Sequence, residues 1–125
     1  MNGTVAKAKK ELKMNRLIVI FPEGAGRWCD IGQLENKKPG RGAAVIALST
    51  GAPIIPVGIF GTDMVFPPYS FKMNPIHTIK VKIGKPLTFE VIYQEGISET
   101  LLETTMQQIM QRIKENITSE IIGKL

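Results

Sequence analysis

The stretch FPEGAGR at residues 21–27 combines residue types that can bind a polar ligand. A carboxylate, two glycines and an arginine directly after an apolar run are required neither by packing nor by solubility. Arg27 can bind phosphate through its planar guanidinium, whereas Glu23 would repel a phosphate and must instead bond a hydroxyl group or hold the arginine in place. Glu23, Gly24 and Arg27 are therefore candidate residues of a ligand site. A loop carboxylate that caps nearby N–H groups is the alternative interpretation of Glu23.

The stretch PGRG at residues 39–42 has the residue types of a second anion-binding turn. A glycine turn that opens a helix leaves backbone N–H groups and the positive end of the helix dipole free for an anion, and Lys38 and Arg41 add charge. The stretch lacks the Gly-Lys-Ser/Thr ending of a P-loop and does not directly follow a strand, which argues against a nucleotide-binding protein. A turn that only starts a helix is the alternative.

Neither of two other reactive side chains has a partner in the nearby sequence. His77 is the only histidine, and no Cys, Asp or Glu close to it predicts a metal or catalytic pair. Cys29 is the only cysteine, so an internal disulfide is excluded and a nucleophile without a nearby histidine is not favoured. We therefore predict neither a metal site nor a catalytic residue in this chain.

The elements that would position the two stretches follow from the apolar pattern. Residues 17–21 and 54–60 are short, rich in β-branched side chains and bounded by prolines or glycines, which predicts strands buried on both faces. Residues 42–50, ended by Gly51, predict a helix between them. Strand, helix and strand in this order predict a right-handed crossover with parallel strands. Glu23 would then lie at the edge where open α/β sheets bind ligands.

The rest of the pattern predicts two further helices and one further strand. A helix capped by Thr4 is expected to run to about Met14. Residues 79–83 alternate Ile or Val with Lys, which is typical of a half-exposed strand near an edge. From Ser98 to about Ile121, apolar residues recur at helical spacing, and we expect this stripe to pack in the core.

Composition restricts the class of protein. A chain of 125 residues is long enough for one domain with a core, and no apolar stretch approaches the roughly 20 residues that span a bilayer. The net charge of +5 is uneven, because residues 1–41 contain nine Lys or Arg and four acids while residues 86–125 contain three and six. Such cations attract phosphate in nucleic acid, anionic lipid or a metabolite. The single cysteine and the absence of a secretory leader pattern predict a cytoplasmic protein.

Three stretches together resemble the second half of the glycerol-phosphate acyltransferase domain, specifically the 1-acyl-glycerol-3-phosphate acyltransferase family of phospholipid synthesis. They are LIVIFPEGAGR, KKPGRGAAVIALSTGAPIIPVGIFGTD and IKVKIGKPL, and the resemblance covers nearly the whole chain. Its most specific part is Phe-Pro-Glu-Gly after an apolar strand, followed downstream by a small-residue, Pro, apolar, apolar, Pro, Val strand at residues 52–57.

The resemblance implies transfer of a fatty acyl group from acyl-CoA or acyl-carrier protein to lysophosphatidic acid or a similar acylated glycerol phosphate. It places the acceptor phosphate site at residues distributed over both glycine stretches: Glu23, Gly24, Arg27, Lys38 and Arg41. We expect no metal, no cofactor and no nucleic-acid partner.

Two departures from the family pattern affect the expected chemistry. The family has an upstream His-x-x-x-x-Asp motif whose histidine is the general base, but the residue five after His77 is Lys82 and no such pair occurs in this sequence. The family also follows Glu-Gly with Thr-Arg, whereas Ala25 and Gly26 here precede Arg27. We expect the isolated chain to lack the general base.

The expected architecture is α/β, with a partly parallel sheet and flanking helices. We expect it to be a fragment of the glycerolipid acyltransferase fold. Residues 1–125 are expected to form the C-terminal part of one acyltransferase domain, without the part that carries the histidine motif. The expected location is the cytoplasm, peripheral to the inner face of a membrane, with self-association of the isolated chain. The alternative function is a non-catalytic anion- or lipid-binding module derived from the same fold.

Overall fold

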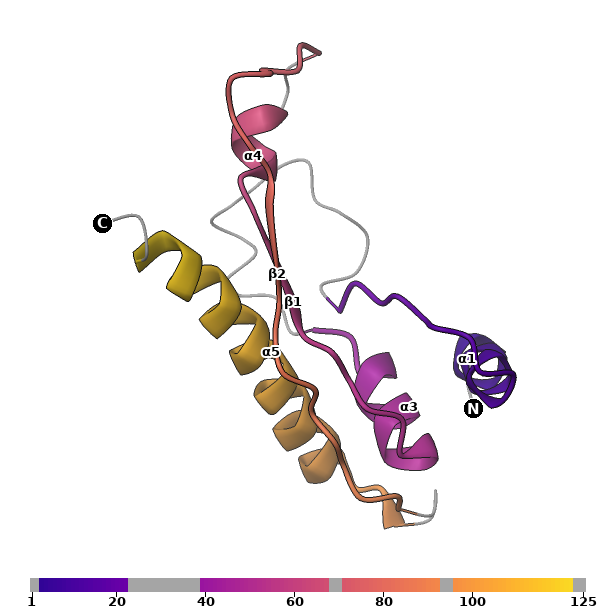
Figure 1. The fold of residues 1–125 in the computed structure, drawn as a ribbon. Helices are drawn as coiled ribbons and strands as arrows, with labels where there is room; N and C mark the ends of the chain where they lie inside the picture. The colour runs from indigo at the N-terminus through magenta and orange to yellow at the C-terminus, as the bar shows by residue number, and fades with distance from the viewer. Residues whose placement is uncertain (1–2, 23–38, 68–70, 93–95, 123–125) are drawn as a thin grey trace.

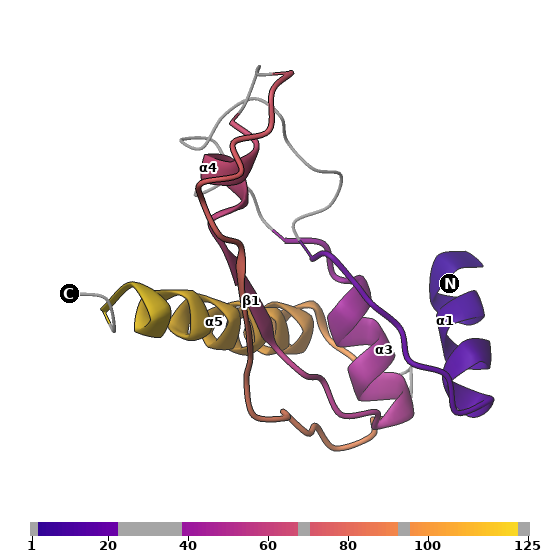
Figure 2. The same ribbon diagram turned by 45° about the horizontal axis from the view of Figure 1, so that its top comes forward.

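The computed structural model describes residues 3–22, 39–67, 71–92 and 96–122, which are arranged as Figure 1 shows. Its elements are the following, in chain order: α1 (Gly3–Lys13), α3 (Gly42–Thr50), β1 (Val57–Phe60), α4 (Thr62–Val65), β2 (Lys80–Ile83) and α5 (Glu99–Ile122). In both views α3 lies between α1 and α5, and α5 runs alongside the two strands (Figures 1 and 2). The helices α1, α3 and α5 confirm the helices predicted from the sequence, to within one or two residues at each end. The predicted cap at Thr4 is wrong, because α1 already begins at Gly3 and Thr4 lies within the helix.

Helix α3 is apolar around most of its circumference because it packs against other helices on two sides. Ala44 has no exposed surface and Leu48 is buried, and both lie in the core cluster with Leu102, Met106 and Ile109 of α5. The small alanine side chains of α3 leave room for the bulkier side chains of α5. The stripe predicted along α5 is therefore confirmed as core packing.

The ends of α3 and α5 are set by local hydrogen bonds. Gly51 adopts the left-handed conformation (φ 71°) and its N–H donates to Ala47 O at 2.8 Å, which ends α3 as glycine favours. At the start of α5 the Ser98 hydroxyl oxygen accepts a hydrogen bond from the N–H of Leu101 at 3.2 Å. Ser98 is thus the N-cap of α5.

Helix α1 packs on the opposite side of α3 from α5. Val5 and Ala8 are buried against Ile46, with Leu12 half-buried beside them. An isolated helix of 11 residues is marginal in water, so this contact with α3 supplies most of its stability.

The sheet is antiparallel and differs from the parallel pair that the sequence predicts. Val57 pairs with Ile83 and Phe60 with Lys80, and Ile54 and Leu87 extend the ladder with N···O distances of 2.8 and 2.7 Å. Residues 17–21 belong to no strand among the residues described, and Leu17, Val19 and Phe21 are exposed. The mixed α and β content is as expected, but the predicted parallel pairing is not present, because the backbone of residues 54–60 bonds to the β2 side instead.

The two faces of the sheet have different surroundings. A Cβ on Gly58 would lie 3.0 Å from Asn116 Cβ, so the glycine lets α5 approach β1 closely, and the Asn116 side-chain amide donates to Pro56 O at 3.0 Å. Lys82 also faces α5, where its ammonium bonds the Ser119 hydroxyl. The opposite face presents the exposed side chains Val57, Ile59, Val81 and Ile83. The prediction that residues 54–60 are covered on both faces is therefore wrong.

Truncating the α3–α5 core should destabilise the chain strongly. Ile109 is 2% exposed and lies in that core, so Ile109→Ala should lower the free energy of unfolding by about 2–5 kcal/mol. Urea denaturation followed by circular dichroism measures the change. The neighbouring exposed residue gives the matched control, since Gln108→Ala should change stability by less than about 0.5 kcal/mol. Equal effects of the two substitutions would contradict the assigned core.

Candidate functional site

Arg41 is the one predicted site residue that the structure describes. The other four, Glu23, Gly24, Arg27 and Lys38, lie outside the described residues, so their roles stay predictions. Arg41 is exposed and directly precedes α3, with φ −84° and ψ −7°. The predicted glycine turn into a helix at residues 39–42 is therefore confirmed.

The two glycine stretches are joined by a backbone hydrogen bond. The N–H of Gly40 donates a hydrogen bond to Pro22 O at 2.8 Å. Pro22 directly precedes Glu23 in the sequence, and Gly40 directly precedes Arg41. This hydrogen bond brings the start of one predicted stretch to the middle of the other.

The N-terminus of α3 has donors that no helical acceptor satisfies. The first hydrogen bond of the helix runs from Val45 N to Arg41 O at 3.1 Å, so the N–H groups of Gly42, Ala43 and Ala44 have no partner within the helix. The first turn contains no acidic residue, and the Arg41 side chain makes no cap. This end therefore has the positive polarity of the helix dipole without a protein carboxylate on its own first turn.

Arg41 is already paired in this structure. Its guanidinium forms a salt bridge with the Glu99 carboxylate, which lies at the start of α5. The two side chains are 50% and 71% exposed, and such exposed pairs contribute only about 0–1 kcal/mol. A phosphate at this turn would thus have to share or displace Glu99, a competitor that the sequence did not reveal.

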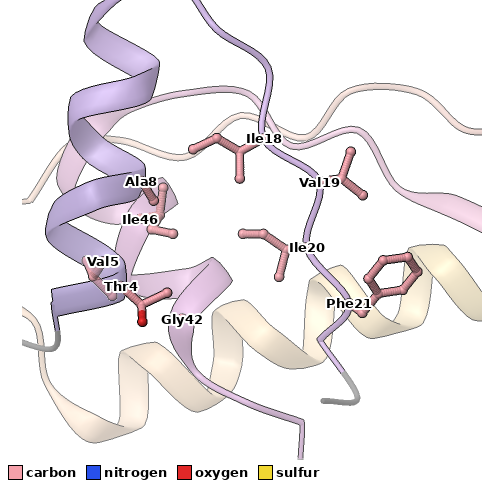
Figure 3. Close-up of a pocket in the computed structure, with 9 residues that line it drawn as sticks. All are labelled: Thr4, Val5, Ala8, Ile18, Val19, Ile20, Phe21, Gly42 and Ile46. Atoms are coloured by element: carbon pink, nitrogen blue, oxygen red, sulfur yellow. The ribbon is translucent and has the colours of Figure 1, made fainter. Parts of the chain in front are cut away.

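An apolar pocket of about 380 Å³ opens beside this turn, between α1, α3 and residues 18–21. Its lining residues come from three segments far apart in the sequence: Thr4, Val5, Ala8, Ile18, Val19, Ile20, Phe21, Gly42 and Ile46. Figure 3 shows Ile18 and Ile20 pointing toward α1 and α3, whereas Val19 and Phe21 point the other way. This alternation is that of an extended chain. Among the described lining residues, Thr4 has the one polar side chain.

This pocket was not predicted from the sequence. The apolar pattern puts Val5 and Ala8 on one stripe of a short helix and Ile46 in the next helix, but it does not pair them. A contact between the two helices could have been predicted, because an 11-residue amphipathic helix has to pack on a neighbour and α3 is the neighbouring helix in the chain. The pocket itself depends on where residues 18–21 lie, which the apolar pattern does not determine.

The described residues contain no other candidate centre. His77 is exposed. Within residues 3–22, 39–67, 71–92 and 96–122, no group of three or more His, Cys, Asp or Glu side chains is placed to hold a metal ion. No helix in this part of the chain has the length and apolar character needed to cross a membrane.

The fold is a mixed α/β one in which an apolar pocket adjoins the N-terminus of a helix. The model of the family described as Acyltransferase matches residues 1–60, a range that includes all nine lining residues of the pocket and both glycine stretches. The match is consistent with the acyltransferase resemblance that the sequence shows, over this part of the chain. A search of curated proteins and a search of solved structures found no match.

If the turn at residues 39–42 binds phosphate, the Arg41–Glu99 pair should control its affinity. Arg41→Ala should weaken the binding of glycerol 3-phosphate about two- to tenfold, because an exposed charge-assisted contact is lost, and Glu99→Gln should strengthen it by removing the competing carboxylate. Titration calorimetry at low and high salt measures both changes, and added salt should reduce them.

Arg112→Ala is the matched control, because Arg112 is an exposed arginine on α5 and its removal changes the net charge by the same amount. If Arg41→Ala and Arg112→Ala weaken binding equally, only the overall charge matters and no site at Arg41 exists.

Proposed function

We propose that this chain forms the acceptor-binding part of an acyltransferase that acts on an acylated glycerol phosphate such as lysophosphatidic acid. The observation that favours this substrate class is the juxtaposition of an apolar pocket with the turn at which the two glycine stretches meet. An acylated glycerol phosphate has the same two parts, a hydrocarbon chain and a phosphate. The family match over residues 1–60 supports the general class of reaction.

In the proposed arrangement each group of residues has one task. The side chains from α1, α3 and residues 18–20 exclude water from the acyl chain of the acceptor, and burial of each CH₂ group there is worth about 0.8 kcal/mol. The N–H groups at the start of α3, together with Arg41, hold the phosphate. Arg27 and Lys38 add positive charge, and Glu23 orients a hydroxyl of the glycerol.

Acyl transfer requires a general base, and this sequence lacks the motif that supplies it in the family. A hydroxyl oxygen of the acceptor attacks the thioester carbonyl, a base takes the hydroxyl proton, and the thiol of coenzyme A or the carrier protein leaves with a proton. In the family the base is the histidine of His-x-x-x-x-Asp, and that pair is missing here. We therefore assign substrate binding to these residues, within the C-terminal part of an acyltransferase domain, and assign proton transfer to a group outside them.

The same missing motif favours one alternative, a binding module that retains the pocket and the turn without chemistry. Both functions place the chain at the cytoplasmic surface of a membrane, where an acylated glycerol phosphate resides. They differ in whether a thioester donor reacts. Acyl-CoA or acyl-carrier protein is a partner only in the first.

Ile20 should distinguish binding of the acyl chain from binding of the phosphate. Ile20 lines the pocket and points into it, so Ile20→Ser should weaken binding of lysophosphatidic acid at least about threefold while leaving glycerol 3-phosphate unaffected. Leu17→Ser is the matched control, since Leu17 is more exposed and is not among the lining residues. Titrations with both ligands give the comparison. An equal loss for both ligands, or for both variants, would reject the acyl-chain pocket.

The chain alone should not transfer acyl groups above the buffer background. Loss of a general base typically slows such a reaction by about 10²–10⁴-fold. The assay is release of free thiol from acyl-CoA in the presence of lysophosphatidic acid, with extraction of the lipid product. Turnover that a substitution such as Ile20→Ser abolishes would show that this sequence contains its own catalytic base, contrary to the proposal.

A further inference from the structure

The segment at residues 17–21 is an extended chain that pairs with no strand among the residues described. It follows α1 in Figure 1, and Figure 3 shows the side chains of residues 18–21 pointing alternately toward the pocket and away from it. In the part of the chain that the structure describes, the backbone of residues 17–21 makes no hydrogen bond. An extended segment of this kind presents its N–H and C=O groups to any strand that can reach them.

The hydrogen bond at the end of this segment shows which of its two edges is open. Pro22 O accepts the N–H of Gly40 at 2.8 Å, so this carbonyl points toward the turn that precedes α3. Along an extended chain, successive residues direct their N–H and C=O groups to alternate edges. The edge opposite the turn therefore receives the N–H and C=O groups of Leu17, Val19 and Phe21. We call this the open edge.

The open edge has none of the features that protect an edge strand. Natural edge strands are commonly protected by charged side chains, proline or a bulge. Residues 17–21 include no charged residue and no proline, and Leu17, Val19 and Phe21 are 80%, 71% and 69% exposed. An apolar edge of this kind pairs readily with another chain.

The sequence of the segment is nearly symmetric about Val19. In either direction it has a large apolar residue, isoleucine, valine, isoleucine and a large apolar residue. In an antiparallel pair of two copies centred on Val19, this valine faces itself, Ile18 faces Ile20, and Leu17 faces Phe21. Pairs of β-branched side chains, and of aliphatic with aromatic ones, stabilise neighbouring strands. The best partner for this segment is therefore the same segment of a second copy.

The same register satisfies the backbone of the open edge. Val19 exchanges N–H···O=C hydrogen bonds with the second copy's Val19, and Leu17 exchanges them with the second copy's Phe21. Pro22 has no N–H to donate, and its position in this register requires none.

No like charges meet in this contact. Arg16 is the charged residue nearest to the segment, and it already pairs with Glu11 of its own chain at 2.7 Å. In the antiparallel register Arg16 lies opposite the second copy's Pro22. The two Arg16 residues are then about 20 Å apart along the strands, and physiological salt screens their repulsion at that distance.

We propose that residues 17–21 pair with the same residues of a second copy of this chain, as an antiparallel ladder about a two-fold axis. Because one edge of each segment is open, pairing ends at two copies and does not continue into a fibre. The interface is small, so the dimer should be weak, with a dissociation constant in the micromolar range. This pairing goes beyond the proposed acyl transfer, because it concerns an edge that no ligand of the pocket has to contact.

Sedimentation velocity of the full chain over a range of concentrations tests the pairing. The unchanged chain should pass from monomer to dimer as its concentration rises. Val19→Lys should raise the dissociation constant at least about tenfold, because the two-fold axis places the two lysines opposite each other. The matched control is Val91→Lys, the same change at an exposed valine outside the segment, which should dimerise as the unchanged chain does.

A charge exchange tests the register. Val19→Glu alone should be monomeric for the same reason as Val19→Lys. An equimolar mixture of the two variants should form a heterodimer, because residue 19 faces residue 19 and opposite charges then lie side by side. A mixture of Val91→Lys and Val91→Glu should show no such preference for the heterodimer.

A pair of proline substitutions tests the edge. Val19→Pro removes an N–H from the open edge and should prevent dimerisation, whereas Ile18→Pro removes an N–H from the opposite edge and should leave the dimer in place. Circular dichroism of each variant shows whether it is folded. The charge exchange needs no proline, so it decides the question if either proline variant fails to fold.

Three results would overturn the proposed dimer. They are a monomer at every concentration of the unchanged chain, a dimer that Val19→Lys and Val91→Lys weaken equally, and no heterodimer in the mixture of Val19 variants. A dimer that Phe71→Ser dissolves and Val19→Lys does not would assign the contact to the segment between β1 and β2 instead. Titration of glycerol 3-phosphate into the unchanged chain tests the proposed function separately, so failure of the dimer and failure of that function are distinguishable.

Discussion

The packing of α3 between α1 and α5 is the constraint on which the rest of this structure depends. Helix α3 has only nine residues, and on one side its alanines and Leu48 contact the long apolar stripe of α5, while on the other Ile46 contacts α1. The start of the same helix has N–H groups without a partner within the helix, and Ile46 and Gly42 line the apolar pocket. The candidate site is thus positioned by a helix that is itself held from two sides.

Because of this packing, residues 1–60, which match the family model, depend for their burial on residues later in the chain. The matched range ends at residue 60, but most of the core that buries α3 comes from α5 and from half-buried residues such as Leu87 and Phe89. Glu99, which pairs with Arg41 in the turn at residues 39–42, also lies in α5. Residues 61–125 therefore complete the packing and the electrostatics of the site, whatever their relation to the family.

Sequence patterns predicted the helices well because each has its own local signal. Gly51 ends α3, and the stripe along α5 has a clear helical period. The strands were predicted less well, because an apolar run shows that a segment can be buried but not which segment pairs with it. Residues 54–60 pair with β2, where Gly58 allows α5 to approach, and residues 18–21 line a pocket instead of forming a strand.

The site shows the same division between local and tertiary information. The turn at residues 39–42 is visible in the sequence because proline, glycine and the start of a helical pattern are adjacent. Its partner Glu99 is 58 residues from Arg41, and the lining of the pocket comes from three separate segments, so both depend on how α1, α3 and α5 pack. The exposed face of the sheet has the same origin: in β2 the lysines face α5 and the alternating Val81 and Ile83 face outward, which reverses the usual rule that the apolar side of a strand is buried. A period of two specifies that the two kinds of side chain lie on opposite faces, and only the position of α5 decides which face is covered.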